Sequence, residues 1–256
     1  MTALAPFAEE SVFIGRSLRQ SLRNPEGLLM AVLLPVLVML LFTFVFGGAL
    51  DVGNVDYVNY VVPGIILLCA GFGASSTAVD VATDLETGIM DRFRTMPIRA
   101  WAVLTGHVVA SLTRNLLATG IVIGVGLLLG FRPTAGPAQW IIAIAVVALW
   151  ILTITYLFAA IGLAAGSPAA ANGYGFILLF LPYVSSAFVP VDTLPDWLRG
   201  FAELQPITPV IESVRSLLTG TDPGWMPVAA VAWCAVLMLV AVLLAVVLFR
   251  RKAGRR

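Results

Sequence analysis

The sequence predicts an all-α integral membrane protein with six transmembrane helices, from its composition and from the placement of its charges. Of its 256 residues, 60% are hydrophobic and only 11% are charged, and the mean hydropathy is +0.99. A water-soluble domain carries roughly 25% charged residues, so this chain has too few charges to cover an aqueous surface. Long segments also contain no Asp, Glu, Lys or Arg at all.

Five charge-free segments supply the expected spans. Four of them each match one bilayer-crossing helix of about 20 apolar residues, and the longest, 133–191, is long enough for two. Helix-breaking residues cluster in this longest segment at Gly166-Ser167-Pro168 and Asn172-Gly173, so we expect the turn between its two helices there. The expected spans are 28–50, 59–79, 105–130, 140–165, 174–188 and 226–249.

Several small or breaking residues lie within these spans. Pro35, Pro63 and Pro182 predict kinks, which neighbouring helices tolerate in a membrane. Pairs of glycines four residues apart predict close packing between helices, with a subunit interface as the alternative. Both cysteines fall inside spans, where we expect buried free thiols rather than a disulfide. The residues are Gly120 and Gly124, Gly126 and Gly130, Gly162 and Gly166, Cys69 and Cys234.

The distribution of Lys and Arg predicts the orientation. With a cytoplasmic N-terminus, the inner side receives the basic residues of 16–23, 92–99 and 250–256, while the outer side receives Arg132, Arg199 and Arg215. This asymmetry favours both termini in the cytoplasm. An even number of spans is then required, which supports dividing the segment 133–191 in two.

Three segments outside the spans carry further features. Residues 1–24 are expected to form an amphipathic helix lying along the inner membrane surface, with a solvated arm as the alternative. The cytoplasmic segment 80–99 is rich in charge, and the external segment 189–224 alternates prolines with apolar residues. Both of these connections are longer than a simple turn between helices requires.

Several classes of function are disfavoured by missing chemistry. The single histidine, His107, belongs to no cluster of metal ligands, and we expect it to be a packed or interfacial side chain. The expected spans hold no acidic residue, with Asp80 only at the inner end of the second, which weakens ion-coupled transport. A phosphate-binding G-x-x-x-x-G-K-[ST] motif is absent, so ATP would have to be hydrolysed by another polypeptide. No basic patch favours nucleic acid.

Two stretches resemble those of a known family. The first is 84–97, which contains Glu86-Thr-Gly88, the pair Asp91-Arg92 and a closing Thr95-Met-Pro97. The second is 181–198, continued by Gln205-Pro-Ile-Thr-Pro209 and Glu212-Ser-Val-Arg215. Together with the expected spans they are similar to the membrane permeases of type-2 ABC exporters, in particular the daunorubicin-resistance branch of bacterial drug-efflux permeases. Many relatives have Glu where this chain has Asp91.

The resemblance implies a permease without its own ATPase site, in the bacterial inner membrane. Two copies of a separate ABC ATP-binding subunit would hold ATP and Mg, and a second permease, identical or homologous, would complete the transporter. This chain would bind no cofactor and no metal. The segment 80–99 would carry the helix that couples to the ATPase, and a solvated loop that only sets topology is the alternative. The implied coupling residues are Glu86, Gly88, Asp91, Arg92, Phe93, Arg94 and Pro97.

The external stretch would form short re-entrant helices before the last span, and we interpret it as an extracellular gate. A static lid is the alternative. Thr208-Pro209 is a plausible helix start, and Glu212 and Arg215 are spaced to share a helix face. The candidate gate residues are Phe188, Pro190, Asp192, Pro195, Trp197, Glu212 and Arg215.

The expected cargo is lipophilic, because the spans are nearly free of charge. A drug or antibiotic is the leading candidate, a lipid or glycolipid is the second, and an ion-gradient-coupled transporter is more remote. Hydroxyl groups in the spans are candidates for lining the pathway, although helix-to-helix hydrogen bonding is an equally good interpretation. These candidates are Thr153, Thr155, Tyr156, Tyr183, Ser185 and Ser186.

Overall fold

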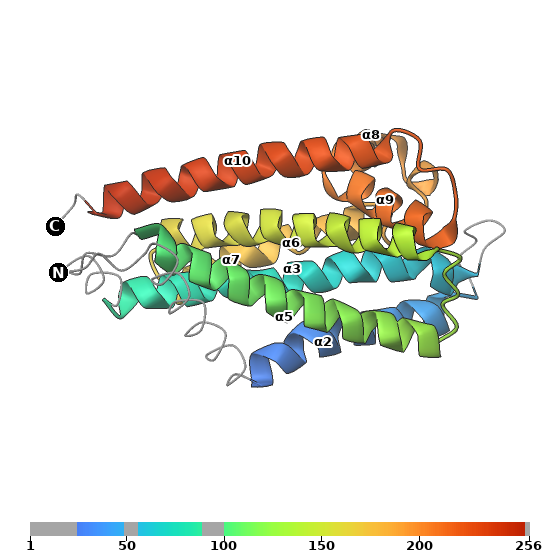
Figure 1. Ribbon diagram of the computed structural model, residues 1–256, viewed down its shortest axis with the longest axis horizontal. Helices are drawn as coiled ribbons and strands as arrows, with labels where there is room; N and C mark the ends of the chain where they lie inside the picture. Colours follow the sequence, from blue (N-terminus) through green and yellow to red (C-terminus); the bar gives the residue numbers. More distant parts are fainter. Residues whose placement is uncertain (1–24, 49–55, 89–99, 254–256) are drawn as a thin grey trace.

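The computed structural model describes residues 25–48, 56–88 and 100–253, and every regular element in these ranges is a helix (Figure 1). The expected interfacial helix of residues 1–24 lies outside them. The elements are α2 Pro25–Leu40, the π-helix η1 Leu41–Phe46, α3 Tyr57–Glu86, α5 Ala100–Leu128, α6 Pro137–Ala164, α7 Pro168–Leu178, the 3₁₀ helices η2 Leu181–Val184 and η3 Val191–Thr193, α8 Asp196–Leu204, α9 Ile207–Thr219 and α10 Met226–Ala253.

Four helices in the described residues are long and apolar enough to cross a membrane. They are α3, α5, α6 and α10, and they match the second, third, fourth and sixth expected spans. The main difference lies in α3, which continues to Glu86 instead of ending near residue 79. Part of the expected coupling segment is therefore the last two turns of a membrane-length helix.

The other two expected spans are shorter helices. The apolar stretch Ala31–Phe46 lies within α2 and η1, and the stretch Pro168–Val184 covers α7 and η2, so each is shorter than α3 or α6. The turn before α7 lies at 165–167, because the Ser167 hydroxyl accepts a hydrogen bond from the Ala170 amide at 3.2 Å and Pro168 occupies the first turn. Asn172 and Gly173, expected in the turn, are instead helical. The crossing of six helices stays a prediction.

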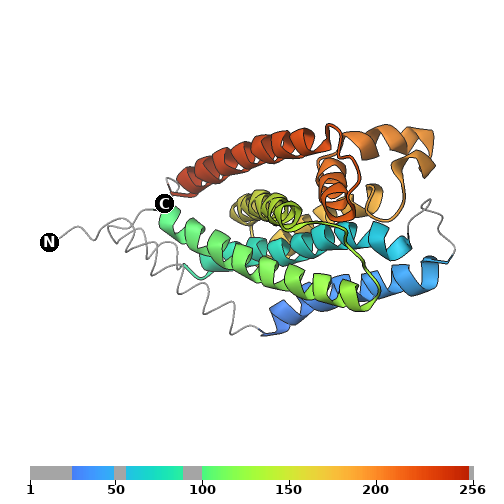
Figure 2. The same ribbon diagram turned by 45° about the vertical axis from the view of Figure 1, so that its right-hand side comes forward.

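The long helices lie side by side, and α3 is central. It contacts α2, α5, α6, α7 and α9, and the side chains of 61–70 are almost completely buried (Figure 1). The helices α8 and α9 gather where α3 and α6 begin, which we call the α9 end. Figure 2 shows α9 lying across the direction of the long helices. In contrast, α3, α6 and α10 finish at the opposite end.

Close helix packing occurs at some of the expected glycines and not at others. A Cβ atom built on Gly162 would lie 2.4 Å from the Ala78 carbonyl oxygen, so α6 approaches the α3 backbone directly. Gly126 faces Val62 at 3.2 Å. By contrast, a Cβ on Gly120 or on Gly124 would meet no atom within 4 Å, so this pair makes no close helix contact with the described residues.

The expected kinks and thiols have mixed outcomes. Pro35 lies inside α2 and Pro63 inside α3, and the kinks expected at both stay a prediction. Pro182 does not kink a span, since it lies in the first turn of η2. Cys69 and Cys234 are free and buried, which confirms the interpretation of both as packed thiols.

Candidate functional site

The backbone between η2 and η3 is irregular and yet buried. Ser185, Ser186, Ala187 and Phe188 are each at most 4% exposed, and none belongs to a regular helix. A buried backbone carbonyl outside a helix needs a hydrogen-bond donor from elsewhere, because neither water nor an intrahelical amide is available. The partners of these carbonyls therefore decide whether the segment is stable.

Three side chains from other elements supply the donors. The Gln205 side-chain amide donates to the Val184 carbonyl. The Arg215 Nη2 donates to the Ser186 carbonyl at 2.6 Å. The Tyr57 hydroxyl donates to the Phe188 carbonyl at 2.9 Å. We call Tyr57, Gln205 and Arg215 the carbonyl clamp, since together they hold alternate carbonyls of residues 184–188.

Arg215 has the largest number of partners in the clamp. It is only 7% exposed, and its Nε donates to the Tyr60 carbonyl at 3.1 Å. Its Nη1 bonds the Glu212 carboxylate one turn earlier in α9, as their spacing predicted. The guanidinium also lies 3.7 Å from the centre of the Tyr60 ring, which favours its positive charge. One arginine thus joins α3, α9 and the irregular segment.

Close packing reinforces the clamp. A Cβ on Gly64 would lie 2.6 Å from the Ala187 carbonyl oxygen, so the segment presses directly on the α3 backbone. The Phe188 ring stacks on Phe42 at 4.2 Å between centroids and on Tyr183 at 5.2 Å. The segment is therefore fixed by apolar contacts as well as by hydrogen bonds.

The candidate gate residues separate into two groups. Phe188, Glu212 and Arg215 meet at the clamp. The other four belong to η3, α8 and their connections, where Pro190 and Pro195 precede the two helices and Trp197 is 80% exposed. The side chains of Trp197, Phe201 and Leu204 follow one face of α8 and are all exposed. The last of the four, Asp192, is exposed too.

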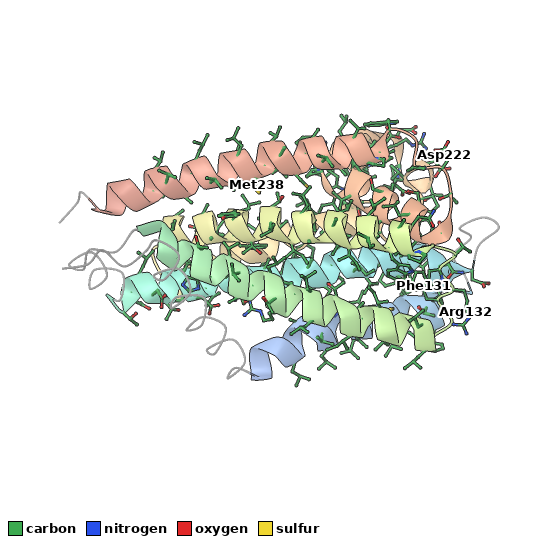
Figure 3. The ribbon with its side chains drawn as sticks, in the orientation of Figure 1. Phe131, Arg132, Asp222 and Met238 are labelled. Atoms are coloured by element: carbon green, nitrogen blue, oxygen red, sulfur yellow. The ribbon has the colours of Figure 1, made fainter. Side chains whose placement is uncertain are left out.

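Loops at the α9 end also hold the helices together. The Arg132 amide donates to the Asn59 side chain at 2.8 Å, and the Thr134 amide donates to the Leu218 carbonyl at 2.9 Å. Figure 3 shows Arg132 and Asp222 at this same end of the bundle, whereas Met238 lies along α10. The connection between α5 and α6 is thereby tied to both α3 and α9.

The candidate pathway hydroxyls do not converge on one site. Thr153 donates to the Leu149 carbonyl at 2.8 Å, Thr155 lies 3.2 Å from the Ser111 hydroxyl, and Ser185 bonds the Pro182 carbonyl. Tyr156 packs near the opposite end of the bundle, beside Val81. The Ser186 hydroxyl is buried and has no hydrogen-bond partner among the described residues. Three of the six hydroxyls thus take part in contacts within helices or between them.

A polar seam between α3 and α5 was missed by sequence reasoning. The buried Asp84 and His107 side chains pair at 3.0 Å. Arg114 Nη2 donates to the Gly73 carbonyl at 2.9 Å and to the Ser76 hydroxyl, and Asp80 is close enough to interact with its charge. Asp80 and Asp84 lie in α3 beyond the expected end of the second span at residue 79. The interpretation of His107 as a packed side chain is confirmed.

Only two of the expected coupling residues lie within the described part of the chain. Glu86 is the last residue of α3, and Gly88, two residues later, has a φ of +69°, a left-handed conformation that favours glycine. The remaining five lie outside the described residues: Asp91, Arg92, Phe93, Arg94 and Pro97. Within the described ranges, no group of three or more His, Cys, Asp or Glu is placed to hold a metal ion.

Comparison with known proteins gives a consistent result. The profile described as ABC-2 type transporter matches residues 10–219. The daunorubicin resistance ABC transporter permease protein DrrB1 of Streptomyces coeruleorubidus is 31% identical over 202 residues, covering 78% of this chain and 71% of the relative. The probable doxorubicin resistance ABC transporter permease protein DrrC of Mycobacterium tuberculosis is 24% identical over 222 residues, with 86% and 80% covered.

A third relative comes from a red alga. The putative transport permease ycf38 of Porphyra purpurea is 25% identical over 221 residues, which covers 84% of this chain and 75% of the relative. The profile match extends from residue 10 through α9, so it includes α3, the polar seam and the carbonyl clamp. The chain belongs to the ABC-2 type transporter family.

Proposed function

We propose that this chain is the membrane permease subunit of an ATP-driven exporter that moves a lipophilic or amphipathic drug or antibiotic out of the cytoplasm or the inner leaflet. Family membership supports the transport role. Two relatives are named for resistance to daunorubicin or doxorubicin, which supports a drug as cargo. The chain crosses the bacterial inner membrane six times, with both termini in the cytoplasm.

The energy comes from a partner. Two copies of a separate ABC ATP-binding subunit bind ATP and Mg, because this sequence contains no phosphate-binding motif of its own. A second permease, identical or homologous, completes the membrane part. The segment 80–99 contacts the ATPase through Arg92, Phe93 and Arg94, which offer an apolar anchor and charge-assisted hydrogen bonds.

The continuity of α3 is the observation that carries the mechanism. This single helix of 30 residues reaches from Glu86, beside the Gly88 bend, to Tyr57 and Tyr60 at the carbonyl clamp. At 1.5 Å per residue it spans roughly 45 Å. A displacement of the coupling segment by ATP binding is therefore delivered along α3 to the clamp, which opens outward. Cargo must bind the two conformations with different affinity for this cycle to transport it.

The test uses the affinity-tagged chain, reconstituted in nanodiscs with the ABC ATP-binding subunit that co-purifies with it. Daunorubicin is expected to stimulate ATP hydrolysis, and replacing Arg92, Phe93 and Arg94 by Ala should abolish the stimulation without preventing membrane insertion. The matched control replaces Arg255 and Arg256 by Ala, which removes the same number of positive charges from the same expected side. Unchanged stimulation in the triple variant would refute the coupling role.

The same preparation shows which class of molecule is transported, by comparing how lipids and daunorubicin stimulate ATP hydrolysis. Stimulation by phospholipid or glycolipid but not by daunorubicin would favour a lipid exporter of the same family. Stimulation by daunorubicin alone supports the drug.

An ion-gradient-coupled transporter remains a second candidate, because the buried Asp84 and His107 pair is the kind of ionisable group that proton relays use. Adding a protonophore at constant ATP concentration distinguishes this candidate from an ATP-driven exporter. ATP-driven efflux persists under these conditions, whereas a proton-driven carrier loses its cargo gradient.

A further inference from the structure

An apolar cavity of about 240 Å³ lies between α5 and α6 in the half of the bundle nearer the α9 end. Its inner wall is formed by buried side chains from α3, α6 and α9, namely Ile66, Val147, Val214 and Leu218. None of the six candidate pathway hydroxyls lines it. An apolar cavity of about 150 Å³ is known to take up benzene. This larger one suits a two-ring apolar group.

The cavity opens on the exposed surface of α5 and α6. Gly120 and Ile144 line it and are both exposed, so they form its mouth on α5 and α6. A Cβ atom on Gly120 would meet nothing within 4 Å, so the missing side chain leaves this mouth open. Gly124, one turn further along α5, is equally exposed and equally free of neighbours, but it does not line the cavity.

The position of the wall connects the cavity to the clamp. Val214 directly precedes Arg215, and Leu218 follows one turn later on α9, where its carbonyl accepts from the Thr134 amide. A guest in this cavity would thus contact the helix that carries the clamp arginine. A transported molecule must bind two conformations with different affinity, and contact with α9 would give a guest here a means of doing so.

We propose that this cavity binds an uncharged aromatic part of the transported molecule, which enters from the bilayer past Gly120. The proposal rests on the proposed export function for the identity of its guest. The occupant is expected to be cargo rather than a resident lipid chain, because the cavity wall includes α9. A permanently seated lipid would hold α9 in one position throughout the cycle.

The test is photolabelling of the full chain in nanodiscs with iodonaphthyl azide, a neutral two-ring probe that partitions into bilayers. The expected result is a saturable label on 116–123 and 140–147, mapped by mass spectrometry and displaced by naphthalene. Gly120→Phe, which fills the mouth, should reduce this saturable label by about tenfold, as expected when about 1.4 kcal/mol of binding is lost. Gly124→Phe should leave it unchanged. Gly120→Leu provides a smaller plug if the phenylalanine variant folds poorly.

A second arm uses a phospholipid that carries a photoreactive acyl chain. We expect its label to be spread over exposed helix faces and to be unaffected by Gly120→Phe. Acyl-chain labelling at the same residues, lost in Gly120→Phe, would identify a resident lipid and overturn the assignment to cargo. Absence of a saturable naphthyl label, or equal loss in both glycine variants, would overturn the site itself. Neither assay uses ATP, so failed export by the complex with its ATPase would instead refute the proposed function.

Discussion

Replacing Arg215 by methionine should lower the free energy of unfolding by about 2–6 kcal/mol, since a buried carbonyl without a donor costs about 1–3 kcal/mol. Two carbonyls lose their donor, those of Tyr60 and Ser186. The Glu212 carboxylate adds little, because its side chain is 31% exposed and can be hydrated. Methionine keeps an unbranched apolar stem, so the change removes mainly the guanidinium.

The measurement is the melting temperature of the purified chain in detergent. For chains of 150–250 residues each kcal/mol shifts it by about 2–4 °C, so we expect a decrease of about 4–24 °C. Arg199→Met is the matched control, because that arginine is 40% exposed and pairs with a fully accessible Asp196 at 3.8 Å. Such surface pairs contribute about 0–1 kcal/mol. Equal melting temperatures for the two methionine variants would refute the clamp.

Two further predictions concern helix packing. Gly162→Leu should sharply reduce the yield of folded protein, because a Cβ atom there would lie 2.4 Å from the Ala78 carbonyl oxygen. Gly166→Leu should be tolerated, because a Cβ atom at that position would meet no atom within 4 Å. Size-exclusion profiles of the two variants test this difference. Asp84→Leu should destabilise the chain by about 1–3 kcal/mol, because His107 loses a buried partner. A double variant that also carries His107→Leu should recover part of the melting temperature, and strictly additive effects would show that the pair is not coupled.

The long helices could be predicted because length and apolar composition are local properties. The end of α3 was wrong for a specific reason. Asp80 and Asp84 were interpreted as the aqueous boundary of a span, but Asp84 is buried against His107, 23 positions later. A charged side chain can continue an apolar helix when a residue on a neighbouring helix pairs with it. Their spacing of four residues on α3, facing His107 and Arg114 on α5, was the signal available in the sequence.

The break before α7 was only partly predicted. Ser167 and Pro168 supplied the correct start, since a serine cap followed by proline is a local signature. Asn172 and Gly173 were misjudged as a turn, because residues that disfavour helices are tolerated inside one when neighbouring helices pack around it.

The candidate gate was predictable only where it depends on neighbours in sequence. The spacing of Glu212 and Arg215 predicted their ion pair. The other acceptors of Arg215 are backbone carbonyls, which every residue possesses, and that of Tyr60 is 155 positions away. No pattern in the sequence distinguishes those carbonyls from any others. The roles of Tyr57 and Gln205 were missed for the same reason.

The contact between Gly64 and Ala187 has a consequence for how the α9 end of the bundle can vary. Main chain meets main chain there, with no flexible side chain between them to absorb a small movement. A shift of α3 by a fraction of an ångström at this level must displace Ala187 by a similar amount. Any residue larger than glycine at position 64 would therefore force the α3 backbone and the Ala187 backbone apart. The two segments would then no longer move together.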